Sequence, residues 1–258
     1  MAMEFPVPSI KTIVWRITLV IALIEAIIML SMGHFEQYMT KFTIVVFDTI
    51  ILVCISTPII YYWIIKPYVI ANNTATEKIK HLALHDPLTQ LANRRLFEEH
   101  LTKRLARFER NGLYGALLLV DMDGFKTIND NYGHQIGDMI LVEIANRLRN
   151  SVRDEDITAR LGGDEFVVLL GELHAELEEA QAEAGEIANR IRNEMKKPVQ
   201  LEEVYHLGAS IGIRLLDEKD TTVERMVREA DVAMYQAKKN GKGQVCFFSP
   251  DIVKGRKK

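Results

Sequence analysis

The sequence predicts a domain of mixed helices and strands, of the α/β or α+β class, preceded by two transmembrane helices and a helical linker. Three observations lead to this prediction. Two apolar runs of about twenty residues, each long enough to cross a bilayer, stand in the first quarter of the chain. Residues 86–258 alternate helical and strand patterns. Charge follows the same division, because residues 1–85 hold six Lys/Arg and five Asp/Glu, and the remainder holds 26 and 30.

Composition argues against some partners. The net charge of −3 gives no electrostatic basis for nucleic-acid binding. Cys54 and Cys246 are too few and too far apart for a disulfide framework or a Cys-x-x-Cys metal site. We interpret them as two buried thiols in a reducing compartment.

The apolar runs predict a hairpin over residues 1–66, with spans at about 13–32 and 42–65. Basic residues lie outside the loop 33–41, which carries only Lys41. We therefore expect both termini in the cytoplasm, in a multi-pass protein of the inner (cytoplasmic) membrane that has the lipid bilayer as a partner. A cleavable signal peptide is a weaker interpretation of the first run, because it lacks a convincing small-x-small site and a second span follows.

Two acids interrupt the spans. With a rise of about 1.5 Å per residue, Glu25 and Asp48 both lie roughly 10 Å below the outer surface. Ionisable groups at such depth are costly and usually face a partner or a cavity. One hypothesis is that the pair shares a proton or cation, together with His34 and Glu36, and forms a sensing element. The alternative is an interhelical hydrogen bond that only assembles the hairpin.

The linker is predicted over residues 67–85. Lys66-Pro67 is expected to interrupt the second helix where it leaves the membrane, and Thr74-x-x-Glu77 resembles a capping box that restarts it. Ala75, Ile79 and Leu82 form a short apolar stripe, compatible with a two-stranded coiled coil or with ordinary packing.

Periodicity then predicts the elements of residues 86–250 in order. Helical faces fall at about 94–110, 140–148 and 222–239, and strands at 115–123, 157–161, 166–170, 199–205, 208–214 and 244–248. Gly162-Gly163 supplies the positive φ of a two-residue hairpin turn between two of these strands. The basic tail, residues 251–258, is expected to be disordered.

Acids stand at the ends of two apolar strands. Asp121 ends one strand, and Asp164 and Glu165 begin another. If the strands are neighbours, three carboxylates converge at one sheet edge, where they would repel one another and raise one another's pKa. Hard oxygen ligands so arranged suit Mg²⁺. The alternative is a tight turn with solvated acids.

Residues 86–248 resemble a GGDEF domain, the catalytic unit of diguanylate cyclases. The matching elements are DPLTQLANRR (86–95), DMDGFKTINDNYGHQIGD (121–138), ARLGGDEF (159–166), ASIGI (209–213) and ADVAMYQAKKNGK (230–242). The resemblance implies an α+β fold of the nucleotidyl-cyclase and polymerase-palm type, a central antiparallel sheet wrapped by helices, over about residues 86–250. It further implies condensation of two GTP into cyclic di-GMP with release of two pyrophosphates, by a homodimer that faces one GTP in each protomer toward the other.

The resemblance also assigns roles to residues. Asp121, the Met122 carbonyl, Asp164 and Glu165 would ligate Mg²⁺ (or Mn²⁺), and Asp164 and Glu165 are the catalytic pair, Asp164 helping to deprotonate the attacking 3′-hydroxyl. Gly162 and Gly163 would let the nucleotide lie against the turn. The remaining substrate-binding positions are Asn129 and Asp138 for guanine, and Lys126, Lys238 and Lys242 for phosphate.

Two positions depart from the family pattern. Lys242 stands where Arg is usual and Gly243 where Asn is usual, and a lysine loses the bidentate fork of an arginine, which suggests a weaker grip on the triphosphate.

Arg153-x-x-Asp156 matches the family's inhibitory site, which implies product inhibition by cyclic di-GMP. Alternatives are a non-catalytic receptor for cyclic di-GMP or GTP and a membrane adaptor, although intact motif residues favour an enzyme.

Overall fold

The structure, a computed structural model, describes residues 10–32, 40–216 and 222–251. The chain divides into two compact units, residues 1–81 and 82–258. His34, Glu36 and the predicted tail from residue 252 lie outside the described residues.

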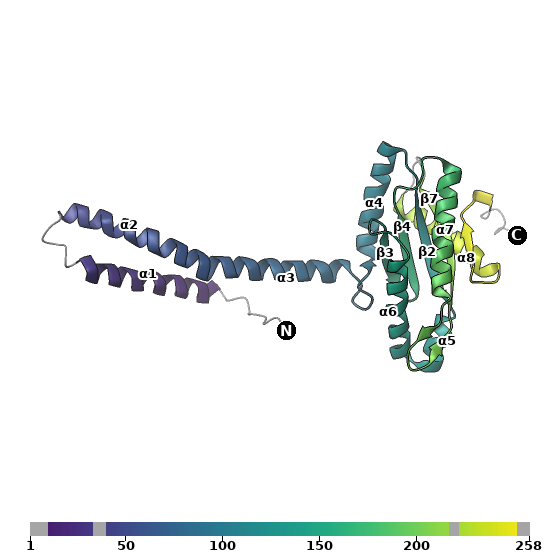
Figure 1. The fold of residues 1–258 in the computed structure, drawn as a ribbon, viewed down its shortest axis with the longest axis horizontal. Coiled ribbons are helices and arrows are strands. Elements are labelled where there is room, and N and C mark those ends of the chain that lie inside the picture. The colour runs from purple at the N-terminus through teal and green to yellow at the C-terminus, as the bar shows by residue number, and fades with distance from the viewer. Residues whose placement is uncertain (1–9, 33–39, 217–221, 252–258) are drawn as a thin grey trace. The chain divides into compact units, whose positions relative to one another are not determined.

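The first unit is built of helices. α1 (Ile10–Met32) and α2 (Lys41–Ile60) lie side by side and pack against each other (Figure 1). Most of their large apolar side chains face outward, such as Trp15 at 68% and Phe42 at 80% exposure. Both segments are long and apolar enough to cross a membrane. Thr40 caps α2, its hydroxyl accepting a hydrogen bond from the Thr43 N–H at 3.3 Å.

The expected break at Lys66-Pro67 is wrong. α2 continues through a π-helical turn, η1 (Tyr61–Ile65), into α3 (Lys66–Leu84), and the Lys66 N–H donates to the Tyr61 carbonyl five residues back. The wider π turn sits just before the proline, whose ring and missing N–H disturb a regular α-helix. Thr74 lies inside α3, so no helix begins there. The side chains of residues 73–80, and with them most of the predicted coiled-coil stripe, lie outside the described set.

The second unit contains a six-stranded sheet in the order β1-β3-β4-β2-β7-β8. Its three inner contacts, β3–β4, β4–β2 and β2–β7, are antiparallel, and β1 and β8 join the edges in parallel. The strands are β1 (Ala92–Asn93), β2 (Gly115–Asp123), β3 (Ile157–Gly162), β4 (Glu165–Leu170), β7 (Gly208–Leu216) and β8 (Val245–Phe247). The helices are α4 (Arg94–Asn111), α5 (Phe125–Tyr132), α6 (His134–Asn150), α7 (Leu177–Met195) and α8 (Val223–Lys239).

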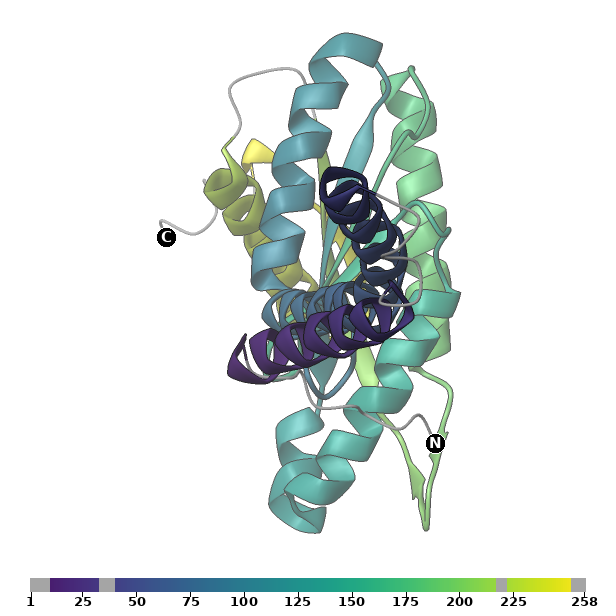
Figure 2. The same ribbon diagram turned by 90° about the vertical axis from the view of Figure 1, so that its left-hand side faces the viewer.

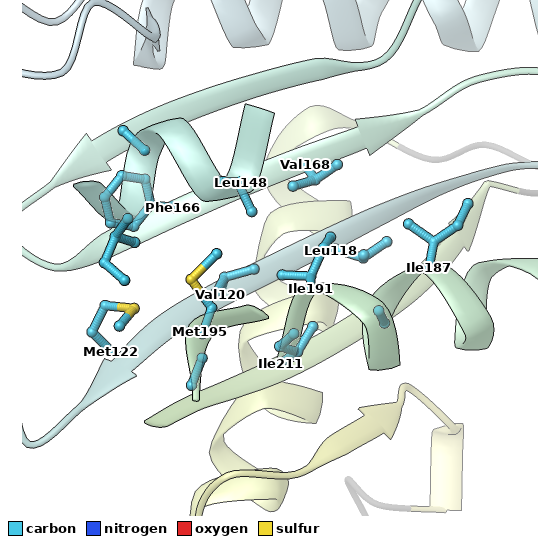
Figure 3. Close-up of a cluster of buried hydrophobic side chains, with 14 of the residues drawn as sticks. Leu118, Val120, Met122, Leu148, Phe166, Val168, Ile187, Ile191, Met195 and Ile211 are labelled. Carbon is cyan, nitrogen blue, oxygen red and sulfur yellow. The ribbon is translucent and has the colours of Figure 1, made fainter. Parts of the chain in front are cut away.

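Helices cover both faces of the sheet, with α4 and α8 on one side and α7 on the other (Figure 2). Alternate side chains of β2 therefore enter two cores. Leu118, Val120 and Met122 pack with Ile191 and Met195 of α7 (Figure 3). The residues between them, Leu117 and Leu119, pack against α4 and α8. Burial on both faces explains why this strand reads as a continuous apolar run.

Most predicted elements are present, with some corrections. Residues 199–205 do not join the main sheet, since β5 (Val199–Gln200) and β6 (Val204–Tyr205) form a separate two-stranded hairpin. α5 and α7 were not predicted. The prediction of two buried thiols is wrong, because Cys54 is exposed on α2 and Cys246 is only partly buried.

Candidate active site

The acids come together where β2 and β4 run side by side. Asp121 and Glu165 are directly opposed in this antiparallel pair, which sets Cβ atoms about 5 Å apart on one face of a sheet. Asp164 precedes Glu165, and its carbonyl accepts a long 3.4 Å hydrogen bond from the Met122 N–H. The sheet register therefore gathers the three predicted carboxylates at one end of the inner strands β2 and β4.

A glycine turn presents these acids. Gly162 has a φ of 144° and Gly163 a φ of 55°, as the sequence predicts. Because Gly162 pairs with Glu165, the two central residues of the turn are Gly163 and Asp164, one position later than predicted. A Cβ at either glycine would meet nothing within 4 Å, so positive φ, rather than crowding, is what requires glycine within the protein.

The acid cluster carries unfavourable charge. Burial raises the pKa of Asp121, and the Asp164 and Asp123 carboxylates raise it further, against the opposing effect of Lys238. Burial also raises the pKa of Glu165, as do its neighbours Asp121 and Asp164. A cation bound here would relieve both effects.

Lys238 supplies one positive charge to this cluster. Its Nζ lies 2.7 Å from Asp121 Oδ2, and the two side chains are 32% and 12% exposed. Among the described residues, no three His, Cys, Asp or Glu side chains are arranged as they stand to hold a metal ion. The oxygen donors nevertheless suit a hard divalent cation, because Asp121, Asp164 and Glu165 come together at the ends of neighbouring strands and burial raises the pKa of Asp121 and Glu165.

Asp123 is a site residue that sequence reasoning missed. It accepts hydrogen bonds from the Ser210 hydroxyl at 3.0 Å and from the Gly243 N–H at 2.9 Å. Asp123 therefore holds the loop that carries Lys242, which itself adopts a φ of 62°. The signal was available, since residues two apart on a strand share a face and Asp123 follows Asp121 by two.

The predicted guanine-binding residues lie on α5 and α6, which pack together. Asn129 Oδ1 is buried and has no hydrogen-bond partner in the described part of the chain. Gly137 makes room for it, because a Cβ there would collide with that oxygen. Asp138 and Lys126 are exposed. A buried acceptor without a donor fits a ligand that brings an N–H group.

α5 begins two residues after β2 ends. Its N-cap, Gly124, has a φ of 85° and makes no side-chain capping hydrogen bond. Gly124 has no side chain that could accept from the first N–H groups of the helix, which directly follow the acidic end of β2 in sequence.

The structure changes the view of the predicted inhibitory pair. Arg153 Nη2 lies 2.8 Å from Glu183 Oε1 of α7. The Asp156 carboxylate is buried and accepts from the Arg153 N–H and the Gly171 N–H, both at 3.1 Å. Both side chains line a cavity of about 270 Å³ that also includes His85 and Arg149. Asp156 therefore holds its own loop in shape, whatever else it binds.

The two acids that the sequence predicts to lie within the membrane are not joined. Glu25 is exposed on α1, Asp48 is partly buried on α2, and no hydrogen bond or ion pair links them in the described part of the hairpin. Their sensing or assembling role stays a prediction.

The fold and the site define a class, that of nucleotidyl-cyclase-like domains, in which a mixed sheet wrapped by helices presents acids from neighbouring strands. The chain belongs to the GGDEF family, since residues 83–244 match the family described as diguanylate cyclase, GGDEF domain.

Curated relatives from Pseudomonas aeruginosa agree. The bifunctional diguanylate cyclase/cyclic di-GMP phosphodiesterase MucR is 41% identical over 179 residues, which are 69% of this chain and 25% of that protein. The diguanylate cyclase TpbB is 41% identical over 167 residues, 64% of this chain and 37% of TpbB. The match thus covers between a quarter and somewhat more than a third of the length of these relatives.

Solved structures give the same fold. The GGDEF domain of TpbB (also called YfiN) has a TM-score of 0.63 at 38% identity, covering 67% of this chain and 99% of that one. The coiled coil and GGDEF domain of DgcB from Caulobacter crescentus, solved with c-di-GMP, has a TM-score of 0.63 at 26% identity, covering 69% and 93%.

Proposed function

We propose that the protein is a membrane-anchored diguanylate cyclase that condenses two GTP into cyclic di-GMP and two pyrophosphates. The observation that carries the proposal is the register that opposes Asp121 to Glu165, with Asp164 in the adjoining turn. The relatives named above, which are described as diguanylate cyclases, support it.

The acid residues would hold Mg²⁺, or Mn²⁺ in its place. Asp121, the Met122 carbonyl, Asp164 and Glu165 are the candidate ligands. Such a cation neutralises triphosphate charge and stabilises attacking and leaving oxygens. Asp164 is suited to accept the proton of the attacking 3′-hydroxyl, because it lies in the exposed glycine turn rather than within a strand.

Lysines would bind the phosphates. Lys238 pairs with Asp121 in this structure and would be available to a phosphate if a divalent cation were bound by the acids. Lys126 and Lys242 are exposed and able to reach a polyanion. The uncapped N-terminus of α5 adds backbone donors of the kind that bind phosphate.

Asn129 and Asp138 would read the base. Guanine presents N1–H and N2–H₂ as adjacent donors, whereas adenine has an acceptor at N1. Asn129 Oδ1, which has no hydrogen-bond partner among the described residues, could accept a hydrogen bond from guanine. Opposite adenine N1 it would face another acceptor and stay without a partner, so GTP would be favoured over ATP.

Two features of regulation belong to the proposal. Each domain would hold one GTP, so two protomers must face each other and activity depends on a homodimer set by the hairpin. Cyclic di-GMP would inhibit at Arg153 and Asp156, displacing Glu183 from the arginine.

The test is incubation of the detergent-solubilised full chain with GTP and Mg²⁺, with products identified by mass. We expect a mass equal to cyclic di-GMP from the wild type and none from Glu165→Ala. A wild type that binds GTP or cyclic di-GMP without turnover would instead define a receptor.

A further inference from the structure

The turn that joins α3 to the sheet is held by one carboxylate. Asp86 Oδ1 accepts hydrogen bonds from the Thr89 N–H at 2.8 Å, from the Thr89 hydroxyl at 2.7 Å and from Arg160 Nη1 at 3.1 Å. Two backbone hydrogen bonds, Asp86 N–H to the Leu91 carbonyl and Gln90 N–H to the Asp86 carbonyl, close this junction turn (residues 86–91). Asp86 stands two residues after Leu84, the last residue of α3.

Arg160 links this junction turn to the glycine turn between β3 and β4, which carries Asp164 and is called the acid turn below (residues 162–165). Its Nε and Nη2 donate to the Gly163 carbonyl at 3.0 and 2.8 Å, so a single guanidinium binds the junction turn and the glycine turn together. The Arg160 and Asp86 side chains are 12% and 19% exposed, which limits screening by solvent. Burial alone would raise the pKa of Asp86, but hydrogen bonds from Thr89 and Arg160 lower it overall.

The Gly163 carbonyl controls the backbone orientation of Asp164. It belongs to the planar peptide that begins Asp164, so fixing its oxygen orients the backbone of that acid. The two glycines bring no side chains with which the turn could pack. The hydrogen bond from the Met122 N–H to the Asp164 carbonyl, the next carbonyl along the turn, is long at 3.4 Å.

We propose that Asp86 and Arg160 are positioning residues that transmit the position of the end of α3 to the acid turn and thereby set its affinity for the divalent cation. Neither is a catalytic residue. The proposal rests on the proposed cyclase function and adds to it a route by which a change in the linker alters turnover within a protomer.

The test compares Asp86→Asn and Arg160→Lys in the full chain. Asparagine keeps the acceptor for Thr89 and loses the charge that holds Arg160, and lysine loses the fork. Arg147→Lys is the matched control. Arg147 is also an arginine between an acid and backbone carbonyls, bonded to Glu143 at 2.8 Å and to the Pro198 carbonyl at 2.9 Å, with 14% exposure.

Hydrogen exchange measured on peptides covering residues 161–166 reads the acid turn directly. We expect exchange there to accelerate about tenfold or more in both variants, which is the effect of losing one charge-assisted hydrogen bond, and to stay unchanged in Arg147→Lys. The Mg²⁺ concentration for half-maximal turnover should rise by a similar factor. The double variant should be no worse than Arg160→Lys, because both changes break one connection.

Unchanged exchange and Mg²⁺ dependence in Asp86→Asn, or equal effects in Arg147→Lys, would overturn the proposal. So would additive effects in the double variant. Absence of product from the wild type would refute the cyclase function instead, and the exchange measurement would still decide whether the turn depends on Asp86.

Discussion

A substitution at Gly137 should separate stability from guanine recognition. A Cβ at this helical position would collide with Asn129 Oδ1 and lie 3.3 Å from Phe125 Cζ. The amide oxygen is the end of a flexible side chain, so α6 can accept alanine if Asn129 rotates away. The rotation removes from the site the acceptor that is proposed to bind guanine.

Two opposite effects follow from Gly137→Ala. Alanine in place of glycine inside a helix stabilises by up to about 1 kcal/mol, less the cost of moving Asn129. Loss of one base hydrogen bond costs about 1–2 kcal/mol, so the KM for GTP should rise roughly five- to thirtyfold. The thermal midpoint should therefore stay level or rise while discrimination between GTP and ATP falls.

Gly185→Ala is the control. Gly185 also lies inside a helix, α7, but a Cβ there would meet Phe247 at an ordinary 3.6 Å. The control should gain stability and keep its KM. Steady-state kinetics with GTP and ATP, beside thermal unfolding of the same samples, measure both effects, and an unchanged KM in Gly137→Ala would refute the role of Asn129.

Three further predictions concern charges. Burial and neighbouring acids raise the pKa of Glu165 above its ordinary 4.5, so the ionised side chain destabilises the fold progressively as pH rises from that value. Glu165→Gln should therefore raise the melting temperature at pH 7 without divalent cations by about 2–4 °C per kcal/mol relieved, and not at pH 4. Glu229→Gln should cost about 3–5 kcal/mol in denaturant unfolding, because Arg214, 11% exposed, loses its buried partner. Asp156→Ala should destabilise by about 2 kcal/mol, whereas Arg153→Ala, whose ion pair is half-exposed, should cost under about 1 kcal/mol and abolish product inhibition of turnover. A stable, still inhibited Arg153→Ala would contradict the inhibitory assignment.

Hydrophobic pattern predicted the parts of the fold in which burial is one-sided or complete. The apolar run at 115–120 and the stripe Ile140, Leu141, Ile144 and Leu148 show their buried faces directly in the sequence. Helix α7 was not predicted, because much of its buried face is alanine, which gives a weak hydrophobic stripe in the sequence. These alanines are Ala180, Ala184 and Ala188. The π-helical turn η1 was not predicted, because the chain accommodates Pro67 by widening one helical turn. The presence of a proline does not by itself show whether a helix will break or widen.

The candidate site likewise has features that the sequence predicts and features that it does not. Acids at strand ends were predictable because strand periodicity and the glycine turn both mark them. Partnerships were not, since the Lys238–Asp121 pair joins residues 117 positions apart and the Gly243–Asp123 hydrogen bond joins residues 120 apart. Such contacts depend on how α8 and its following loop return to the sheet, which local pattern does not encode.

These long-range contacts decide the charge balance at the ends of β2 and β4, where the acids lie. Lys238 pairs with Asp121, and Arg94 acts on Glu165 only as a weaker charge that opposes Asp121, Asp164 and Asp231. Asp123 is already engaged by Ser210 and Gly243. The acid cluster therefore carries more negative charge than the neighbouring basic residues neutralise, and burial makes that excess charge costly. Such an excess stabilises nothing in the isolated domain. Under the proposed function, a divalent cation held by Asp121, Asp164 and Glu165 would offset this excess, and Lys238 would then be available to a phosphate group.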